Sequence, residues 1–269
     1  MNTELERKYR SLIDNLRGME SAVVAFSGGV DSTFLAYAAQ EALGAGALAV
    51  SAVSESYPSW ERKEAEELAS RIGIRHRSIH TRELDIPEYA ANSPDRCYHC
   101  KLNLFRTMLR VAEEEGVAHV LDGSNADDRN DFRPGMRALK ELGIRSPLLE
   151  VGLVKDEIRE LSRRFSLPTW NKQSFACLAS RIPYGERITA EKLKQVEEAE
   201  DVLRSLGFRV YRARHHGHLV RIEVAEDELA KALSLRSELG DAMRRIGFIY
   251  VTIDLQGYRT GSMNENLRR

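Results

Sequence analysis

Cysteine is scarce in this chain, which has only Cys97, Cys100 and Cys177 among 269 residues. So small and odd a number does not build the disulfide framework of a small secreted domain. We therefore expect reduced thiols. Each of them is a candidate nucleophile, a metal ligand or a small buried side chain.

Long apolar runs are also missing, and no stretch approaches the length of a membrane-spanning helix. The first ten residues, MNTELERKYR, are charged and lack the apolar core of a signal peptide. With 42% hydrophobic and 30% charged residues, the composition is typical of a globular protein with a proper core. These features predict a cytoplasmic protein without a membrane partner.

The sequence has no excess charge of either sign. Its 40 Lys and Arg residues face 41 Asp and Glu residues, for a formal net charge of −1. Nucleic-acid-binding proteins carry a basic surface or a dedicated module, and neither is visible here. We therefore expect no nucleic-acid partner.

The most informative segment that is present has the sequence SGGVDST and spans 27–33. It lies between an apolar run at 22–26 and a second one at 34–39, which predicts a buried strand, a glycine-rich turn and a helix. Such a turn directs backbone N–H groups and a helix dipole at one point, where phosphate binds. The hydroxyl groups add donors, and Asp31 can hold Mg²⁺. The residues expected to bind nucleotide here are Ser27, Gly28, Gly29, Asp31, Ser32 and Thr33.

This loop is not a Walker A motif, because it contains no lysine and no G-x-x-x-x-G-K-[ST] spacing. It resembles the S-G-G-x-D-S signature of the PP-loop ATP pyrophosphatases. The resemblance implies that the loop holds the pyrophosphate end of ATP and that AMP goes to an acceptor. The alternative is a helix N-terminus that is merely rich in glycine and serine.

Strands alternate with helices through the first part of the chain, which predicts an α/β fold with a parallel sheet and helices on both faces. The expected strands are 21–26, 47–53, 75–80 and 118–122, and the expected helices are 4–18, 32–43, 59–72, 98–115 and 154–166. Ligands bind at the carboxyl ends of such strands. We therefore assign Ser54, Gly123, Asn125 and Asp128 to the nucleotide site, with helix capping as the alternative for the carboxylate.

The periodic pattern ends after Pro168. Residues 169–187 are polar and rich in turn formers, which predicts a long functional loop that bears a cysteine. Beyond it we expect a helix at 190–206, strands at 208–214 and 218–224, a helix at 226–245 and a strand at 248–255. The predicted domains are therefore 1–168 with the nucleotide loop, the 169–187 loop, and a smaller α+β domain at 188–269 for substrate binding or oligomerisation.

The cysteine spacing favours one kind of metal site. Cys97 and Cys100 form a C-x-x-C motif before an amphipathic helix, and no second pair completes a zinc site. A third thiolate from Cys177 would give the ligand set of a [4Fe–4S] cluster with one open iron. Arg181 near Cys177 predicts thiolate character for that residue. The alternative is three buried thiols.

The chain resembles the LarE family of PP-loop sulfur transferases over nearly its whole length. The resemblance rests on the segments 27–33, 96–101, 122–128, 131–135, 177–185, 212–216 and 254–264. It implies an adenine nucleotide alpha hydrolase-like fold and a homo-oligomer. It also implies that ATP adenylates a carboxylate of pyridinium-3,5-biscarboxylic acid mononucleotide and releases pyrophosphate. A sulfur nucleophile then displaces AMP and leaves a thiocarboxylate.

Members of this family obtain sulfur in two ways. In the sacrificial type, the cysteine that matches Cys177 gives up its own sulfur and becomes dehydroalanine. In the other type, three cysteines hold a [4Fe–4S] cluster. The open iron of this cluster carries an extra sulfide, which comes from an external sulfide or sulfur donor. Because cysteines stand at all three positions, we favour the cluster type, with Cys97, Cys100 and Cys177 as iron ligands.

The resemblance also draws attention to polar residues near the end of the chain. Arg212 and Arg214 lie two apart in a predicted strand and so share a face, where two guanidiniums suit a phosphate. Glu223 is a candidate for orienting substrate or for acid–base work. The alternatives are a solvated basic strand and an exposed glutamate. We expect His215, His216 and His218 to be partly exposed. The substrate-phosphate ligands are then Lys101, Ser180, Arg181, Arg212 and Arg214, and the catalytic residues are Cys177, Asp31 and Glu223.

Three other functions compete with this one. A tRNA-thiolating PP-loop enzyme would also use three cysteines, but it needs a basic surface. An ammonia-using synthetase would need a glutaminase region, and none is visible. A nucleotide sensor would leave the cysteines unexplained.

Overall fold

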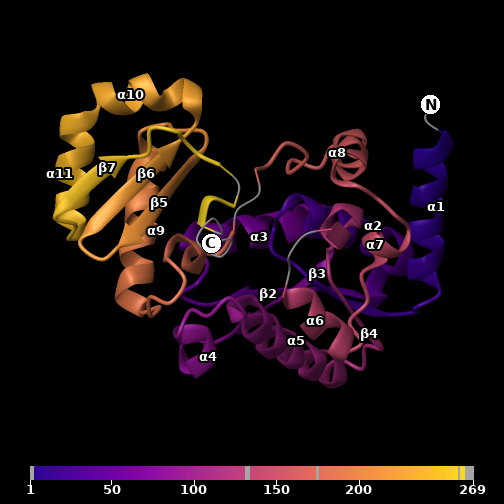
Figure 1. Cartoon of the computed structure of the whole chain (residues 1–269). Helices are drawn as coiled ribbons and strands as arrows, with labels where there is room; N and C mark the ends of the chain where they lie inside the picture. Colours follow the sequence, from indigo (N-terminus) through magenta and orange to yellow (C-terminus); the bar gives the residue numbers. More distant parts are fainter. Residues whose placement is uncertain (1–2, 131–133, 174–175, 260, 264–269) are drawn as a thin grey trace. The chain divides into compact units, whose positions relative to one another are not determined.

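The computed structural model describes residues 3–130, 134–173, 176–259 and 261–263, shown in Figure 1. They form two compact units. Unit 1 comprises Met1–Ser54, Ser59–Glu83 and Asp95–Phe175, and unit 2 comprises Glu55–Pro58, Leu84–Pro94 and Ala176–Arg269. Residues 131–133, 260 and 264, which contribute to the family resemblance, lie outside the described residues.

A four-stranded parallel sheet forms the centre of unit 1. Its strands are β1 (Ala22–Ala25), β2 (Ala47–Val53), β3 (Arg75–His80) and β4 (His119–Leu121), in the order β3-β2-β1-β4. The register places Ala22 beside Ala47 on one side and His119 on the other. All four strands therefore end at one edge, and the segments that follow β1 and β4 are neighbours there.

Helices cover both faces of this sheet. The longer ones are α1 (Thr3–Arg17), α2 (Val30–Leu43), α3 (Ser59–Ile72), α5 (Arg96–Glu114), α6 (Gly135–Glu141) and α8 (Lys155–Arg164). The shorter helices of unit 1 are η1 (Gly44–Gly46), η3 (Ala126–Asn130) and α7 (Pro147–Glu150). The short helix η2 (Glu83–Asp85) begins at the last residue of a unit 1 segment, and α4 (Pro87–Ala90) belongs to unit 2.

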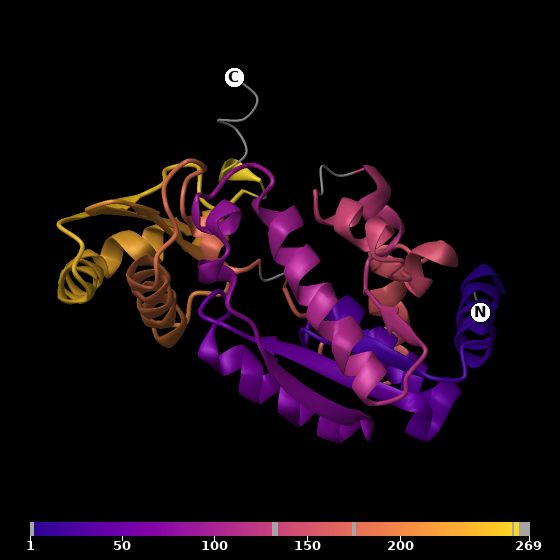
Figure 2. The ribbon, with the colours of Figure 1, turned by 90° about the horizontal axis from the view of Figure 1, so that it is seen from below.

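The strand residues alternate between two hydrophobic cores. Ala22, Val24, Ala47 and Ala49 belong to the core that α1, α2, α3 and α8 complete. Val23, Leu48 and Val50 belong to the core that α5 and α6 complete. Figure 2 looks onto this second face, with α5 lying across the strands. The predicted α/β fold, a parallel sheet with helices on both faces, is confirmed.

Unit 2 contains a smaller mixed sheet. Its elements are η4 (Leu178–Arg181), α9 (Ala190–Ser205), β5 (Tyr211–His216), β6 (Leu219–Val224), η5 (Glu226–Glu228), α10 (Leu229–Ser234), α11 (Arg236–Ile246) and β7 (Tyr250–Ile253). Strand β6 lies in the middle, antiparallel to β5 and parallel to β7. The expected α+β unit near the end of the chain is therefore confirmed.

The helix expected at 226–245 is wrong in its continuity, because the structure divides it into η5, α10 and α11. The break lies at Leu235, where the Ser234 hydroxyl donates to the Lys231 carbonyl oxygen at 2.7 Å. A serine side chain that takes a helix carbonyl in this way competes with the backbone ladder. The sequence analysis predicts each domain as one continuous segment of the chain. In the structure, unit 2 also includes residues 55–58 and 84–94.

Among the described residues, no helix is both long enough and apolar enough to cross a membrane.

Candidate functional site

The turn between β1 and α2 has the geometry of an anion-binding loop. Gly28 has a φ of +68°, a left-handed conformation that favours glycine. Gly29 precedes α2 and has no side chain to cap it, so the first N–H groups of the helix stay directed at the loop. The Ser27 and Ser32 hydroxyl oxygens lie 3.0 Å apart and hold the two ends of the turn together. This is the arrangement that the sequence predicts for Ser27–Thr33.

Asp31 lies in the first turn of α2, and its two carboxylate oxygens differ. Oδ2 accepts a hydrogen bond from the Lys155 ammonium at 2.5 Å, at the start of α8. Oδ1 is buried and has no hydrogen-bond partner. A buried carboxylate oxygen without a partner is costly unless a ligand completes it. Asp31 therefore fits the predicted Mg²⁺ ligand, and Lys155 is a cation that sequence reasoning missed.

The segment after β4 packs directly onto this loop. At Gly123, a Cβ atom would lie 3.3 Å from the Ser32 amide nitrogen and 3.5 Å from the Asp31 carbonyl carbon. Only a residue without a side chain brings the two segments so close. The predicted neighbours Ser27–Thr33 and Gly123 are thus brought together within unit 1.

Asn125 and Asp128 organise the first turn after β4. The Asp128 carboxylate accepts the Asn125 N–H at 3.0 Å, and the Asn125 side-chain oxygen accepts the Asp127 N–H at 3.0 Å. Asp127 in turn accepts the Lys155 N–H at 2.8 Å. These contacts are of the helix-capping type that the sequence left as the alternative. Ser54 directly follows β2 and is half-buried.

Lys101 pairs with the carboxylate that follows β4. Its ammonium lies 2.9 Å from Asp122 Oδ2, and Asp122 Oδ1 accepts the Ser124 N–H and hydroxyl. Burial alone would raise the pKa of Asp122, but the Lys101 charge and the Ser124 hydrogen bonds hold it below its ordinary value of 3.8. Lys101 therefore joins α5 to the end of β4 within unit 1. The arginines of the predicted phosphate site belong to unit 2.

A second lysine that sequence reasoning missed reaches the loop itself. The Lys172 ammonium donates to the Gly28 carbonyl oxygen at 3.0 Å and to Glu64 Oε2 at 2.8 Å. No local sequence signal marks this lysine, because its partner in the loop is 144 residues away in the chain.

Cys97 and Cys100 lie in the first turn of α5, three residues apart and so on the same side of the helix. Cys97 is exposed and Cys100 half-buried, and the structure has all three cysteines as thiols. The positive end of a helix dipole favours the thiolate form. Cys177 belongs to unit 2. Within the described ranges, no group of three or more His, Cys, Asp or Glu side chains is already placed to hold a metal ion.

The backbone of Cys177 is held by Arg181. Arg181 Nη1 donates to the carbonyl oxygens of Ala176 and Cys177, and Nε and Nη2 bind Glu200 at 2.8 and 2.9 Å. Arg181 has no exposed surface, so this bidentate pair is fully buried. The charge of Arg181 is therefore directed at Glu200, and its contact with Cys177 is to the backbone.

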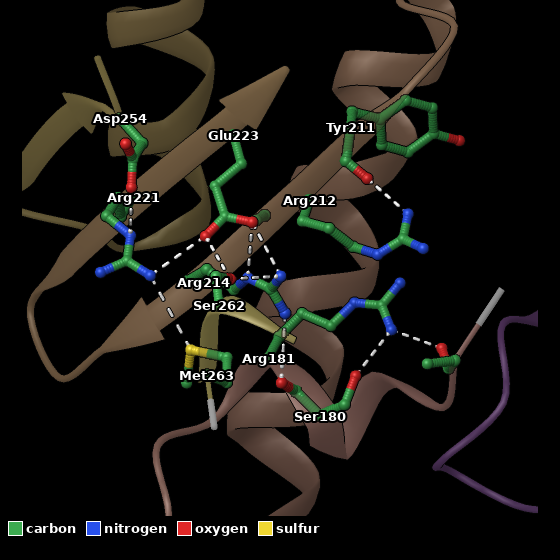
Figure 3. Close-up of polar contacts among 12 residues, drawn as sticks. Ser180, Arg181, Tyr211, Arg212, Arg214, Arg221, Glu223, Asp254, Ser262 and Met263 are labelled. Atoms are coloured by element: carbon green, nitrogen blue, oxygen red, sulfur yellow. Dashed lines mark hydrogen bonds and ion pairs between the residues drawn. The ribbon is translucent and has the colours of Figure 1, made fainter. Parts of the chain in front are cut away.

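A buried carboxylate joins the two strands of the β5–β6 hairpin, as Figure 3 shows. Glu223 has no exposed surface, binds Arg214 at 2.7 Å through Oε2 and binds Arg221 at 3.0 Å through Oε1. Ser262 donates to Glu223 Oε1 at 3.2 Å. The alternative of an exposed glutamate without a structural role is therefore wrong, because this side chain lies at the centre of an ion-pair network.

Arg212 shares this face of the hairpin. It lies directly opposite Glu223, and Arg214 lies opposite Arg221, so the four side chains project to one side. Arg212 and Arg214 are 6% and 5% exposed, which makes the alternative of a solvated basic strand wrong. Burial and the neighbouring Arg181 charge lower the pKa of Arg212, against the opposing effect of Glu200. A buried guanidinium beside a second positive charge is stabilised by an anion.

His215 lies on the opposite face of β5 and is 2% exposed, so the expectation of partial exposure is wrong. Its ring contacts Phe248, and its Nε2 lies 3.0 Å from Gln195 Oε1. The alternation along β5 places this histidine in the core and the arginines on the other face.

Comparison of the sequence with known proteins places this chain in a family. The family model described as asparagine synthase matches residues 9–235. Pyridinium-3,5-bisthiocarboxylic acid mononucleotide synthase of Lactiplantibacillus plantarum is 36% identical over 266 residues, which cover 98% of this chain and 96% of that protein. The chain belongs to the LarE family of PP-loop sulfur transferases.

The chain is also similar to two other proteins. An uncharacterised protein of Synechocystis sp. is 42% identical over 98% of this chain and 100% of its own length. The argininosuccinate synthase of Natronomonas pharaonis is 28% identical over 54% of this chain and 39% of its own length. The predicted LarE family membership and the predicted class of ATP-dependent sulfur transferase are confirmed.

Proposed function

We propose that this member of the LarE family adenylates a carboxylate of pyridinium-3,5-biscarboxylic acid mononucleotide and converts it to a thiocarboxylate. The observation that carries the proposal is the match to the Lactiplantibacillus synthase over 98% of the chain. A carboxylate oxygen attacks the α-phosphorus of ATP, and the bond from that phosphorus to the bridging oxygen breaks. Pyrophosphate leaves, and a sulfur nucleophile then displaces AMP.

The nucleotide part of this proposal is supported by unit 1. The uncapped start of α2 and the left-handed Gly28 suit phosphate oxygens. The orphaned Oδ1 atom of Asp31 suits a Mg²⁺ ion that travels with ATP. With Mg²⁺ bound, Lys155 would share Asp31 with the metal, and Ser54 and Gly123 would flank the nucleotide at the ends of β2 and β4.

The substrate part is supported by unit 2. Arg212 and Arg214 present buried guanidiniums on one face of the hairpin and fit the phosphate of a mononucleotide. Glu223 holds Arg214 in place and so acts on that phosphate through the arginine. Ser180, whose carbonyl oxygen accepts from Arg214 at 3.3 Å, belongs to the same group. Arg181, bound to Glu200, supports the Cys177 backbone in this proposal.

For sulfur delivery we favour a [4Fe–4S] cluster on Cys97, Cys100 and Cys177. Unit 1 supports two of these ligands, because Cys97 and Cys100 share one side of the first turn of α5, where a helix favours thiolates. A cluster bound by three cysteines has one iron open to an external sulfide. The chain's own contribution is to hold the thiols in place, with Arg181 fixing the Cys177 backbone. Sacrificial donation by Cys177 remains the alternative route.

The overall proposal is tested with the full-length chain, purified without oxygen, together with ATP, Mg²⁺ and pyridinium-3,5-biscarboxylic acid mononucleotide. We expect AMP, pyrophosphate and a product in which sulfur has replaced one carboxylate oxygen, measured by mass spectrometry. Asp31→Asn should abolish AMP formation, whereas Asp14→Asn on the exposed face of α1 should not change it. AMP formation that does not depend on the dicarboxylate would contradict the proposed acceptor.

The sulfur route is tested on the same samples. Intact Cys177 after turnover, together with iron and acid-labile sulfide in the protein, supports the cluster. Loss of the elements of H₂S from Cys177 after one turnover shows sacrificial donation. Cys97→Ser and Cys100→Ser should abolish sulfur insertion by the first route and leave a single turnover by the second.

A further inference from the structure

The phosphate-binding loop of this protein contains no cation of its own. Phosphate loops of the Walker type place a lysine on the β- and γ-phosphates, and the sequence SGGVDST has none. The N–H groups of a helix terminus supply only partial charge. Besides the Mg²⁺ proposed at Asp31, a full positive charge from elsewhere in the fold would stabilise pyrophosphate as a leaving group.

Unit 1 brings such a charge to the loop from the segment after α8. The turn at 169–172 closes with the Lys172 N–H donating to the Thr169 carbonyl oxygen at 2.9 Å. Arg159 of α8 donates to the carbonyl oxygens of Trp170 at 2.8 Å and Lys172 at 3.0 Å. The backbone of Lys172 is thus fixed to a helix of the sheet domain.

The side chain of Lys172 is directed inward from this turn. It is only 17% exposed, and its ammonium lies 3.0 Å from the Gly28 carbonyl oxygen. Glu64 of α3, which is 37% exposed, binds the same ammonium at 2.8 Å. The Trp60 ring, one turn earlier on α3, lies 5.7 Å from the ammonium. The Lys172 ammonium therefore contacts the backbone of the phosphate-binding loop, and the Glu64 carboxylate balances its charge.

We propose that Lys172 binds the pyrophosphate portion of ATP and that Glu64 holds the ammonium in readiness. An ammonium carries three N–H donors on a flexible stem, so it can keep Gly28 and exchange Glu64 for a phosphate oxygen. The inference rests on the proposed use of ATP. It adds a side chain that, together with Mg²⁺, offsets the negative charge of the leaving pyrophosphate.

Lys172 could instead only tie α3 to the loop through its ion pair with Glu64. The two roles predict different effects on pyrophosphate binding when Lys172 or Glu64 is substituted. A tie fails in the same way when either end is removed. A phosphate ligand fails only when Lys172 is changed, because neutral Gln at position 64 removes a competitor for the ammonium. Comparing Lys172→Gln with Glu64→Gln therefore separates the two.

The experiment measures binding of Mg²⁺-pyrophosphate and of AMP to the full-length chain by calorimetry. Lys172→Gln should weaken pyrophosphate binding about ten-fold or more, the effect of losing one charge-assisted hydrogen bond, and leave AMP within about two-fold. Glu64→Gln should keep or tighten pyrophosphate binding. Lys231→Gln is the matched control, since Lys231 also donates to a glycine carbonyl, that of Gly207 at 2.8 Å, in unit 2.

Two results would overturn the inference. One is pyrophosphate affinity that stays within two-fold of wild type in Lys172→Gln while AMP still binds. The other is an equal loss for pyrophosphate and AMP in both Lys172→Gln and Glu64→Gln, which is the result a structural tie gives. A wild-type chain that binds neither AMP nor pyrophosphate would instead overturn the nucleotide function itself.

Discussion

Two arginine residues of unit 2, Arg181 and Arg212, differ in what their guanidinium groups contact. Arg181 uses Nε and Nη2 on one carboxylate and Nη1 on the backbone of the cysteine-bearing loop. The pKa of Arg212 is lowered by burial and by the charge of Arg181. Sequence reasoning assigns both residues to phosphate. The contacts favour a supporting role for the first and an anion-binding role for the second.

Removing the partner of Arg181 should be costly to stability. Glu200→Gln removes the carboxylate that binds a fully buried guanidinium, and we expect the free energy of unfolding to fall by about 3 kcal/mol or more. Glu198→Gln, two residues earlier on α9, removes an exposed pair with Lys194 at 3.8 Å and should cost less than about 1 kcal/mol. Urea unfolding of both variants measures the difference. Equal stabilities would show that the Arg181–Glu200 pair does not support unit 2.

The contacts at the nucleotide loop mark the limit of prediction from sequence at this scale. The turn at Ser27–Thr33 could be predicted because its glycine, serine and aspartate residues lie close together in the sequence and by themselves favour a tight turn before a helix. Lys155 and Lys172 could not, since their partners Asp31 and Gly28 are 124 and 144 residues away. A lysine in a polar sequence carries no local sign that it folds back onto a loop.

Elements were predicted well where a local pattern specifies them. Apolar runs and terminal glycines mark strands and helices of unit 1, and the observed bounds of the elements that were predicted differ by a few residues at most. The break at Leu235 could not be predicted, because it depends on the Ser234 hydroxyl bonding to a carbonyl of the folded helix. The inclusion of 55–58 and 84–94 in unit 2 likewise depends on contacts between distant segments.

The close packing of two elements at Gly123 should control nucleotide affinity. In Gly123→Ala the new methyl group would meet the Ser32 backbone at 3.3 Å, so the start of α2 or the end of β4 must shift by a few tenths of an ångström. We expect ATP to bind several-fold more weakly while the protein stays folded. Gly18→Ala is the control, because its nearest neighbours are carbonyl oxygens at 3.6 and 3.7 Å. Equal ATP affinity in both variants would contradict this account.

Both units contain histidines whose pKa in the folded protein lies below its ordinary value. Burial lowers the pKa of His76 in unit 1, and burial with nearby positive charge lowers it for His215 and His216 in unit 2. His215 shows the reason most clearly. Its Nδ1 accepts the Gly217 N–H at 3.2 Å, so Nε2 carries the proton and donates to Gln195. Protonation of Nδ1 would break the first of these bonds.

These shifts determine the sign of an acid response. A folded-state pKa below the ordinary value of 6.5 means that the unfolded chain takes up protons first as the pH falls. The stability that neutral histidine contributes is therefore complete above about pH 6.5 and decreases as the pH falls below it, ahead of most carboxylates. Urea unfolding between about pH 7.5 and pH 5 should show this decrease, and His215→Gln should reduce its slope. A free energy of unfolding that stays constant or rises over this interval would contradict the prediction, because neutral histidines would then contribute nothing to holding either unit folded.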